Sequence, residues 1–167
     1  MMNTQQSLLA EFEYEMANTR RVLARIPADK KNWTPHEKSM DLGRLTRHVA
    51  DIPSWMTMTL KTDELDFSKE NVPSPDFHST DELLAQFDAN TKTAIHSLKE
   101  ASEEHFSQPW TMRNGEQIFF TMPKSAVIRT WVMNHNIHHR AQLGVYLRLL
   151  NIPVPGLYGP SADDTGM

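Results

Sequence analysis

The sequence contains no cysteine among its 167 residues. This absence excludes disulfide bonds, thiolate-held metal sites and a cysteine nucleophile. Any metal ion that the protein binds must therefore be held by nitrogen and oxygen ligands.

Long apolar runs and an excess of basic residues are missing as well. No apolar run approaches the roughly 18 residues that a membrane span needs, so no membrane partner is expected. The first residues, Met1 to Gln6, lack the basic and apolar parts of a signal peptide, which predicts a cytoplasmic protein. A net charge of -4 offers no positive field, and nucleic acid is not expected as a partner.

What is present is the composition of an ordinary globular protein. Hydrophobic residues make up 39% of the chain and charged residues 23%, which suits a packed core beneath a solvated surface. A chain of 167 residues is long enough for one full core and short for two. We expect a single domain over residues 1–167.

Four segments carry apolar residues at helical spacing. They run from about Gln6 to Arg25, Met40 to Leu60, Thr80 to Ala101 and Pro123 to Leu150. Ser39 is the expected N-cap of the second helix, with Asp41 in its first turn. Ser79 and Glu82 have the spacing of a capping box at the start of the third.

The remaining segments predict one hairpin and one crossover. Asn114-Gly115 suits a type I′ turn between the stretches Trp110–Arg113 and Gln117–Phe120. The stretch from Lys61 to His78 shows neither periodicity and predicts a surface connection. Together these elements predict an all-α fold, an antiparallel four-helix bundle with a short β-hairpin before the last helix.

Two histidines in the last helix carry the strongest chemical signal. His135 and His139 are four residues apart, which places both imidazoles on one face of a helix. At about 100° per residue, Gln142 and Leu149 share that inward direction, whereas Arg140 lies on the opposite side.

A third ligand is needed for a metal site, and His48 is the best candidate. A helical wheel of the second predicted helix places His48 on the inner face, with Leu45, Ile52 and Trp55 around it. Three neutral imidazoles would suit zinc, nickel, manganese or iron and leave coordination positions open. The alternative is that the histidines only pack and form hydrogen bonds in the core.

Neighbouring residues narrow the kind of site. Asn136 stands where a zincin motif would have glutamate, and the Glu-x-x-His pairs of di-iron bundles are missing from the second and fourth helices. A mononuclear site is therefore favoured. His138 lies at the margin of the inward face, so we interpret it as a spare ligand or a group that contacts a ligand.

The other candidate residues give weaker signals. Trp55 and Trp131 share the apolar faces and are expected in the core more than against a substrate. Gln142 and Tyr146 could reach a ligand or could equally be polar groups of the bundle. Asp51 could orient an imidazole, although a solvent salt bridge is the simpler role. Structural or solvated roles are expected for the remaining histidines, His36, His78, His96 and His105.

Several of these motifs resemble the DinB-like family, within the DinB/YfiT-like metalloprotein superfamily. The resemblance rests on the segment Trp33–Gly43, the Leu45-x-x-His48 element and the run His135-x-x-His138-His139-Arg140-x-Gln142-Leu143. The ending from Asn151 to Asp164 looks typical of one branch. The resemblance implies an antiparallel four-helix bundle, usually dimeric, with one divalent metal held by three histidines. For that metal we expect zinc or nickel ahead of manganese or iron.

Position by position, the family's ligands match His48, His135 and His139. Some relatives look like transferases that join a low-molecular-weight thiol to an electrophile, and others like metal-dependent hydrolases. The expected function is accordingly a metalloenzyme that activates a thiol or water toward a small-molecule substrate. The alternative is a non-catalytic dimeric stress-response or binding module whose metal is structural.

Overall fold

The computed structural model describes residues 3–69 and 76–165. The predicted crossover from Lys61 to His78 lies partly outside these residues, including Pro73 and Pro75. The long helices are α1 (Thr4–Leu23), α2 (Leu42–Lys61), α3 (Thr80–Glu100) and α6 (His135–Leu149). The shorter elements are the 3-10 helix η1 (Ala28–Lys30), α4 (Glu103–Ser107), α5 (Lys124–Val127), the π-helix η2 (Ile128–Asn134) and the strands β1 (Glu64–Asp66), β2 (Pro109–Asn114) and β3 (Gln117–Pro123).

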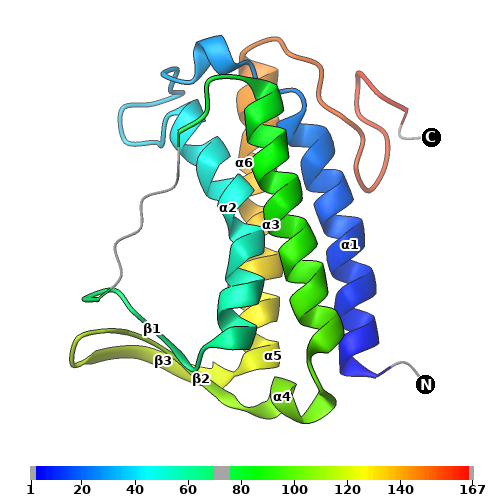
Figure 1. Ribbon diagram of the computed structural model, residues 1–167. Helices are drawn as coiled ribbons and strands as arrows, with labels where there is room; N and C mark the ends of the chain where they lie inside the picture. The colour runs from blue at the N-terminus through cyan, green and yellow to red at the C-terminus, as the bar shows by residue number, and fades with distance from the viewer. Residues whose placement is uncertain (1–2, 70–75, 166–167) are drawn as a thin grey trace.

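The fold is mostly helical, with a small three-stranded sheet at one end (Figure 1). The four long helices lie side by side, with α2 against α3 and α6, and α1 against α3 and α6. Their buried faces form the main core, which includes the fully buried side chains of Phe12, Ile52 and Leu143. Within the described residues, no helix has both the length and the hydrophobicity that a bilayer crossing requires.

Side chains that accept hydrogen bonds from the first turn set the helix starts. Ser79 accepts a hydrogen bond from the backbone N–H of Glu82, which confirms the predicted start of α3. The predicted cap of α2 was wrong: Asp41 caps the helix instead of Ser39, through the backbone N–H of Arg44 at 2.7 Å. The first turn of α2 also requires a glycine at position 43, because a Cβ there would lie 2.9 Å from the Cβ of Lys31.

The predicted hairpin is present as β2 and β3, with a different turn. Asn114 pairs with Gln117, so that Gly115 and Glu116 form the loop. The positive φ of 57° falls on Gly115 and not on Asn114. A turn with its positive φ at the first central glycine is of type II′, not the predicted type I′.

Strand β1 was missed by the sequence analysis, which treated its residues as an irregular connection. It pairs in parallel with β2, and Leu65 lies opposite Met112. The carboxylate of the buried Asp66 accepts hydrogen bonds from the backbone N–H groups of Gly115 and Ser68. These bonds hold the pKa of Asp66 well below its usual range. This short strand is held by the hydrogen bonds of the Asp66 carboxylate. Its sequence therefore shows little of the apolar alternation that predicts strands.

The last predicted helix is divided into α5, η2 and α6. The wider π-helical turns change the angle between successive side chains, so one wheel does not describe the whole segment. Ile128 and Val132 are fully buried as predicted, whereas Leu149, predicted on the inward face, is 56% exposed.

Arg140 also contradicts the wheel, because its side chain is buried. Its guanidinium donates to the Glu15 carboxylate at 2.6 Å and to the Glu15 carbonyl at 2.9 Å. The hydroxyl of Tyr158, from the C-terminal segment, donates to the same carboxylate at 2.7 Å. Helix α6 thus has two buried sides, one toward α2 with the histidines and one toward α1 with Arg140.

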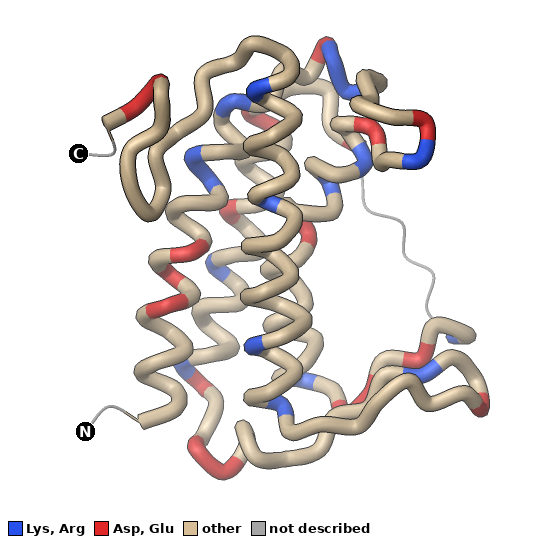
Figure 2. Tube along the Cα trace, turned by 180° about the vertical axis from the view of Figure 1, so that it is seen from behind, with Lys and Arg blue, Asp and Glu red and all other residues tan. Residues whose placement is uncertain are grey.

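Charged residues of both signs are interspersed along the helices (Figure 2). Several form exposed ion pairs between elements, such as Arg20 with Asp88 and Lys61 with Glu100. Such pairs add little stability each, because both charges remain hydrated. The packing of the core therefore holds the helices together.

Candidate metal centre

Three histidines from two helices converge at one point between α2 and α6. The candidate ligand atoms of His48, His135 and His139 all lie within 4.8 Å of one another. The Nε2 atoms of His48 and His135 are 2.9 Å apart. The ring centroid of His139 is 4.7 Å from that of His48 and 4.6 Å from that of His135. The structure thus brings together the three residues that the sequence analysis selected.

The buried neighbours of these histidines fix the two helices that carry them. On α2, Leu45, Val49 and Ile52 are at most 1% exposed and surround His48 along the chain. On α6, Leu143 and Leu147 are fully buried and follow the histidine pair. The π-helical turns of η2 end immediately before His135. Wide turns of this kind occur often at functional sites.

Burial lowers the pKa of all three imidazoles and so favours their neutral form. It is the largest cause that lowers the pKa of His48 to about 4 and that of His135 to about 4, and the neighbouring histidines add to the effect. Burial also lowers the pKa of His139, against a hydrogen bond to Gln142 that raises it. A neutral imidazole has a free lone pair for a metal ion, whereas an imidazolium has none.

Aromatic side chains form one wall of the site. The ring of Trp55 lies edge-on to His48 and His135, with centroids 5.4 Å and 5.3 Å away. Trp131 is 5.7 Å from His135 and stacks on Phe120 of β3 at 5.5 Å. Both tryptophans are only partly buried, so they border the site as well as the core. The sequence analysis did not select Phe120, because its proximity depends on how the hairpin folds against η2.

The other candidate residues divide between the site and the surrounding core. Gln142 contacts the Nδ1 atom of His139 through Oε1 at 2.6 Å. His138 is exposed, with its ring 4.8 Å from that of His139. Tyr146 instead donates to the carbonyl of Met40, and Asp51 accepts from Gln86. Gln142 and His138 therefore adjoin the ligands, whereas Tyr146 and Asp51 form hydrogen bonds with other elements.

The donor set fits a divalent ion of the first transition row. Nitrogen atoms bound to one tetrahedral zinc ion at about 2.0–2.1 Å lie roughly 3.4 Å apart. The 2.9 Å between the Nε2 atoms of His48 and His135 is a hydrogen-bond distance. If the two Nε2 atoms moved about half an ångström further apart, both rings could bind the same ion. Three imidazoles leave at least one coordination position for another ligand.

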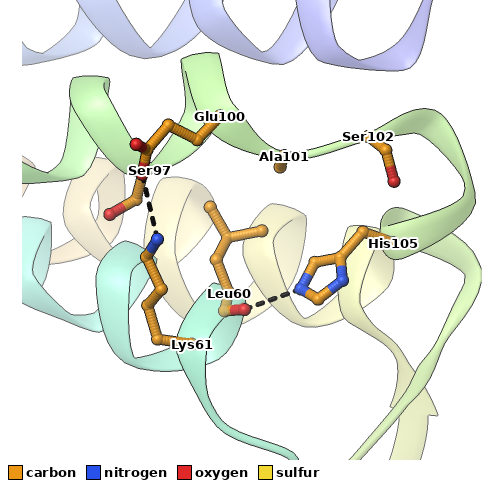
Figure 3. Close-up of a pocket in the computed structure, with 7 residues that line it drawn as sticks. All are labelled: Leu60, Lys61, Ser97, Glu100, Ala101, Ser102 and His105. Atoms are coloured by element: carbon orange, nitrogen blue, oxygen red, sulfur yellow. Dashed lines mark hydrogen bonds and ion pairs between the residues drawn. The ribbon is translucent and has the colours of Figure 1, made fainter.

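Two cavities show where a small molecule could approach. One, of about 420 Å³, borders the histidines and is lined by Thr130, Trp131, Asn134, His135 and His138. The other, of about 220 Å³, lies where α2, α3 and α4 meet (Figure 3). There the charges of Lys61 and Glu100 pair with each other, and His105 donates to the carbonyl of Leu60. Leu60 lies about 18 Å along α2 from His48 at 1.5 Å per residue, so the first cavity is the one beside the candidate ligands.

Comparisons with known proteins identify the family and the fold of the chain. The model of the DinB family matches residues 1–165. The chain belongs to the DinB family. It is 25% identical to the uncharacterized protein YrdA of Bacillus subtilis over 166 residues, which cover 98% of this chain and 93% of YrdA.

Two solved structures have the same fold. A DinB-like protein from Bacillus cereus has a TM-score of 0.70 at 22% identity, with 90% of this chain and 95% of that chain covered. The DinB-like protein YjoA from Bacillus subtilis has a TM-score of 0.67 at 18% identity, with 87% and 92% covered. The family membership and the DinB-like fold expected from the sequence are thereby confirmed.

Proposed function

We propose that this DinB family protein is a metalloenzyme in which His48, His135 and His139 hold one divalent ion, with zinc or nickel ahead of manganese or iron. The convergence of three imidazoles from α2 and α6, that of His139 buried and the other two partly buried, supports the proposal most directly. We also propose that the four long helices form the antiparallel bundle predicted from the sequence.

A divalent ion bound there would act as a Lewis acid that lowers the pKa of a thiol or a water molecule. The chain itself supplies the position of the ligands. The rings of Trp55 and Trp131 pack against His135, and the cavity beside His135 is large enough for a small molecule.

A thiol is the favoured first substrate. The groups named around the three rings are glutamine, histidine and aromatic side chains, none of which is a carboxylate base. A thiol has a free pKa of about 8.5, compared with 15.7 for water, so it ionises with less help. The proposed reaction is transfer of a low-molecular-weight thiol to a small electrophile, with metal-dependent hydrolysis as the second reaction type.

The first test is the metal content of protein prepared without chelators, with zinc and nickel supplied. One equivalent per chain is expected in the wild type and a large loss in His48→Ala, His135→Ala and His139→Ala. Less than about a tenth of an equivalent in the wild type would overturn the proposal. Turnover of a model electrophile with and without a thiol then tests the reaction type.

A non-catalytic role for the metal is the second candidate, because the three histidines join α2 to α6. A structural ion would act as a staple between these helices. This role predicts a melting temperature that collapses on chelation, without thiol-dependent turnover. The homodimer remains a prediction, which sedimentation equilibrium of the full chain tests.

A further inference from the structure

We infer that Gln142 is a positioning residue that holds His139 in the tautomer able to bind a metal through Nε2. The inference rests on the proposed metal site. It gives a role to a residue that the sequence analysis placed only within reach of a ligand.

The contact that carries the inference is short and well placed. Gln142 follows His139 by three residues, one helical turn, and its side chain is half-buried. Its Oε1 atom lies 2.6 Å from Nδ1 of His139. A carbonyl oxygen can only accept a hydrogen bond, so Nδ1 of His139 must carry the proton. The proton of a neutral ring is then on Nδ1, and Nε2 has a free lone pair.

The other end of the same amide contacts a second histidine. The Nε2 atom of Gln142 lies 3.3 Å from Nε2 of His138. An amide nitrogen donates, so His138 accepts at that atom and holds its own proton on Nδ1 when neutral. In this orientation the amide oxygen and nitrogen each meet a ring nitrogen that can take the opposite role, Nδ1 of His139 as donor and Nε2 of His138 as acceptor. His138 thus contributes to the site through Gln142, although it is not one of the three converging histidines.

A neutral amide has a different effect from the carboxylate that often supports a metal-bound histidine. A carboxylate fixes the ring and also increases the basicity of the ligand. An amide fixes the ring without adding negative charge beside the ion. More of the positive charge of a bound ion would then be available to a substrate than beside a carboxylate, which suits a site with three imidazole ligands.

The direct test needs no metal. The ¹⁵N shifts of the histidine ring nitrogens distinguish the two neutral tautomers in the metal-free protein. We expect His139 in the Nδ1–H form in the wild type and in Gln142→Glu, which keeps the accepting oxygen. In Gln142→Met, which has a similar length and no such acceptor, we expect a mixture of both forms.

The second test is zinc affinity by competition with a coloured chelator. Removing a group that supports a ligand costs roughly 10- to 100-fold in affinity, which is the loss expected for Gln142→Met. Gln142→Glu should bind at least as tightly as the wild type. Gln86→Met is the matched control, because Gln86 is another half-buried helical glutamine whose side chain donates to Asp51 on α2. The melting temperatures of the metal-free variants should stay close to that of the wild type.

The outcomes separate this inference from the proposed function. A wild type that binds one zinc ion, with Gln142→Met equally tight, would overturn the role of Gln142 and leave the metal site standing. An equal loss in Gln86→Met would also overturn it, because the effect would then be general. An Nε2–H tautomer of His139 in the wild type would contradict the inference whether or not metal binds. A wild type that binds no zinc or nickel would overturn the proposed function and this inference together.

Discussion

The Nε2 atoms of His48 on α2 and His135 on α6 lie 2.9 Å apart and form a hydrogen bond. One of the two rings must donate, so one Nε2 atom carries a proton that an incoming ion would replace. Because the pKa of each ring is lowered to about 4, neither imidazole becomes a doubly protonated imidazolium near neutral pH. A hydrogen bond therefore joins α2 to α6 at the point where the proposed ion would join them through stronger metal–nitrogen bonds.

Zinc should stabilise the protein through this link. With free zinc at 100 times its dissociation constant, the free energy of unfolding should rise by about 2.7 kcal/mol, provided that only the folded state binds. Differential scanning calorimetry with and without zinc measures the shift. His48→Ala should abolish it, because the two remaining ligands both lie on α6.

His96→Ala is the control for that experiment. The side chain of His96 is exposed on α3 and contacts Glu100, so its loss should leave the shift intact. An unchanged shift in His48→Ala would contradict the role of His48 as a ligand.

The tryptophans beside the histidines should report ion binding. Trp55 and Trp131 both lie within 6 Å of His135 by ring centroids. Nickel, which has unfilled d orbitals, should quench their fluorescence, whereas filled-shell zinc should quench it much less. The quenching should decrease in Trp55→Phe and in Trp131→Phe at equal nickel occupancy.

Trp110 provides the internal comparison for fluorescence. It is buried in the small core of the sheet, where its indole N–H donates to Thr62. Trp110→Phe should therefore retain the nickel-dependent quenching of the wild type. Equal quenching in all three variants would show that nickel acts elsewhere on the protein.

The sequence predicted the candidate site well because its signal is local. Helical spacing aligns His135 and His139, and the wheel of the second helix turns His48 inward. Both helices were recognised from apolar spacing alone. The convergence of the three rings then followed from packing α2 against α6.

Two of the errors came from interactions between segments far apart in the sequence. Strand β1 depends on the carboxylate of Asp66, which bonds to Gly115 nearly fifty residues later. Arg140 was predicted on the outer side because a wheel with one apolar face cannot represent a helix buried on two sides. Its partner Glu15 is on α1, and nothing in the spacing of the last helix indicates that pairing.

This buried pair predicts a large loss of stability in Arg140→Met. The side chains of Arg140 and Glu15 are 1% and 7% exposed, so removal of the guanidinium leaves a carboxylate with little solvent. Breaking one partner of a buried pair costs about 3–5 kcal/mol. Urea denaturation of the metal-free protein should show a loss in this range.

Arg148→Met is the matched control on the same helix. Arg148 forms an ion pair with Asp163 while its side chain stays 49% exposed, and such pairs contribute about 0–1 kcal/mol. Similar losses in the two variants would contradict the special role of the buried pair. A double variant, Glu15→Gln with Arg140→Met, should recover part of the lost stability, because it leaves no buried unpaired charge.

The same network predicts an alkaline transition that depends on Tyr158. Burial of its hydroxyl is the largest cause that raises the pKa of Tyr158 to about 12, followed by the hydrogen bond to Glu15, whereas Arg140 acts in the opposite direction. The ring itself is exposed, so the effect is confined to the hydroxyl that points toward Glu15. An unfolded tyrosine has a pKa of about 10.

The direction of the pH effect follows from these two pKa values. Below pH 10 the phenol is protonated in both states, and its full contribution to stability is present. Between about pH 10 and 12 the unfolded chain loses the proton first, so stability should fall as the pH rises through this window. Ultraviolet difference absorbance of the wild type minus Tyr158→Phe isolates the titration of this one phenol from those of Tyr14 and Tyr146. Glu15→Gln should shift its midpoint downward, because the negatively charged acceptor is lost, whereas a midpoint near 10 in the wild type would show that the hydroxyl is not held by the network.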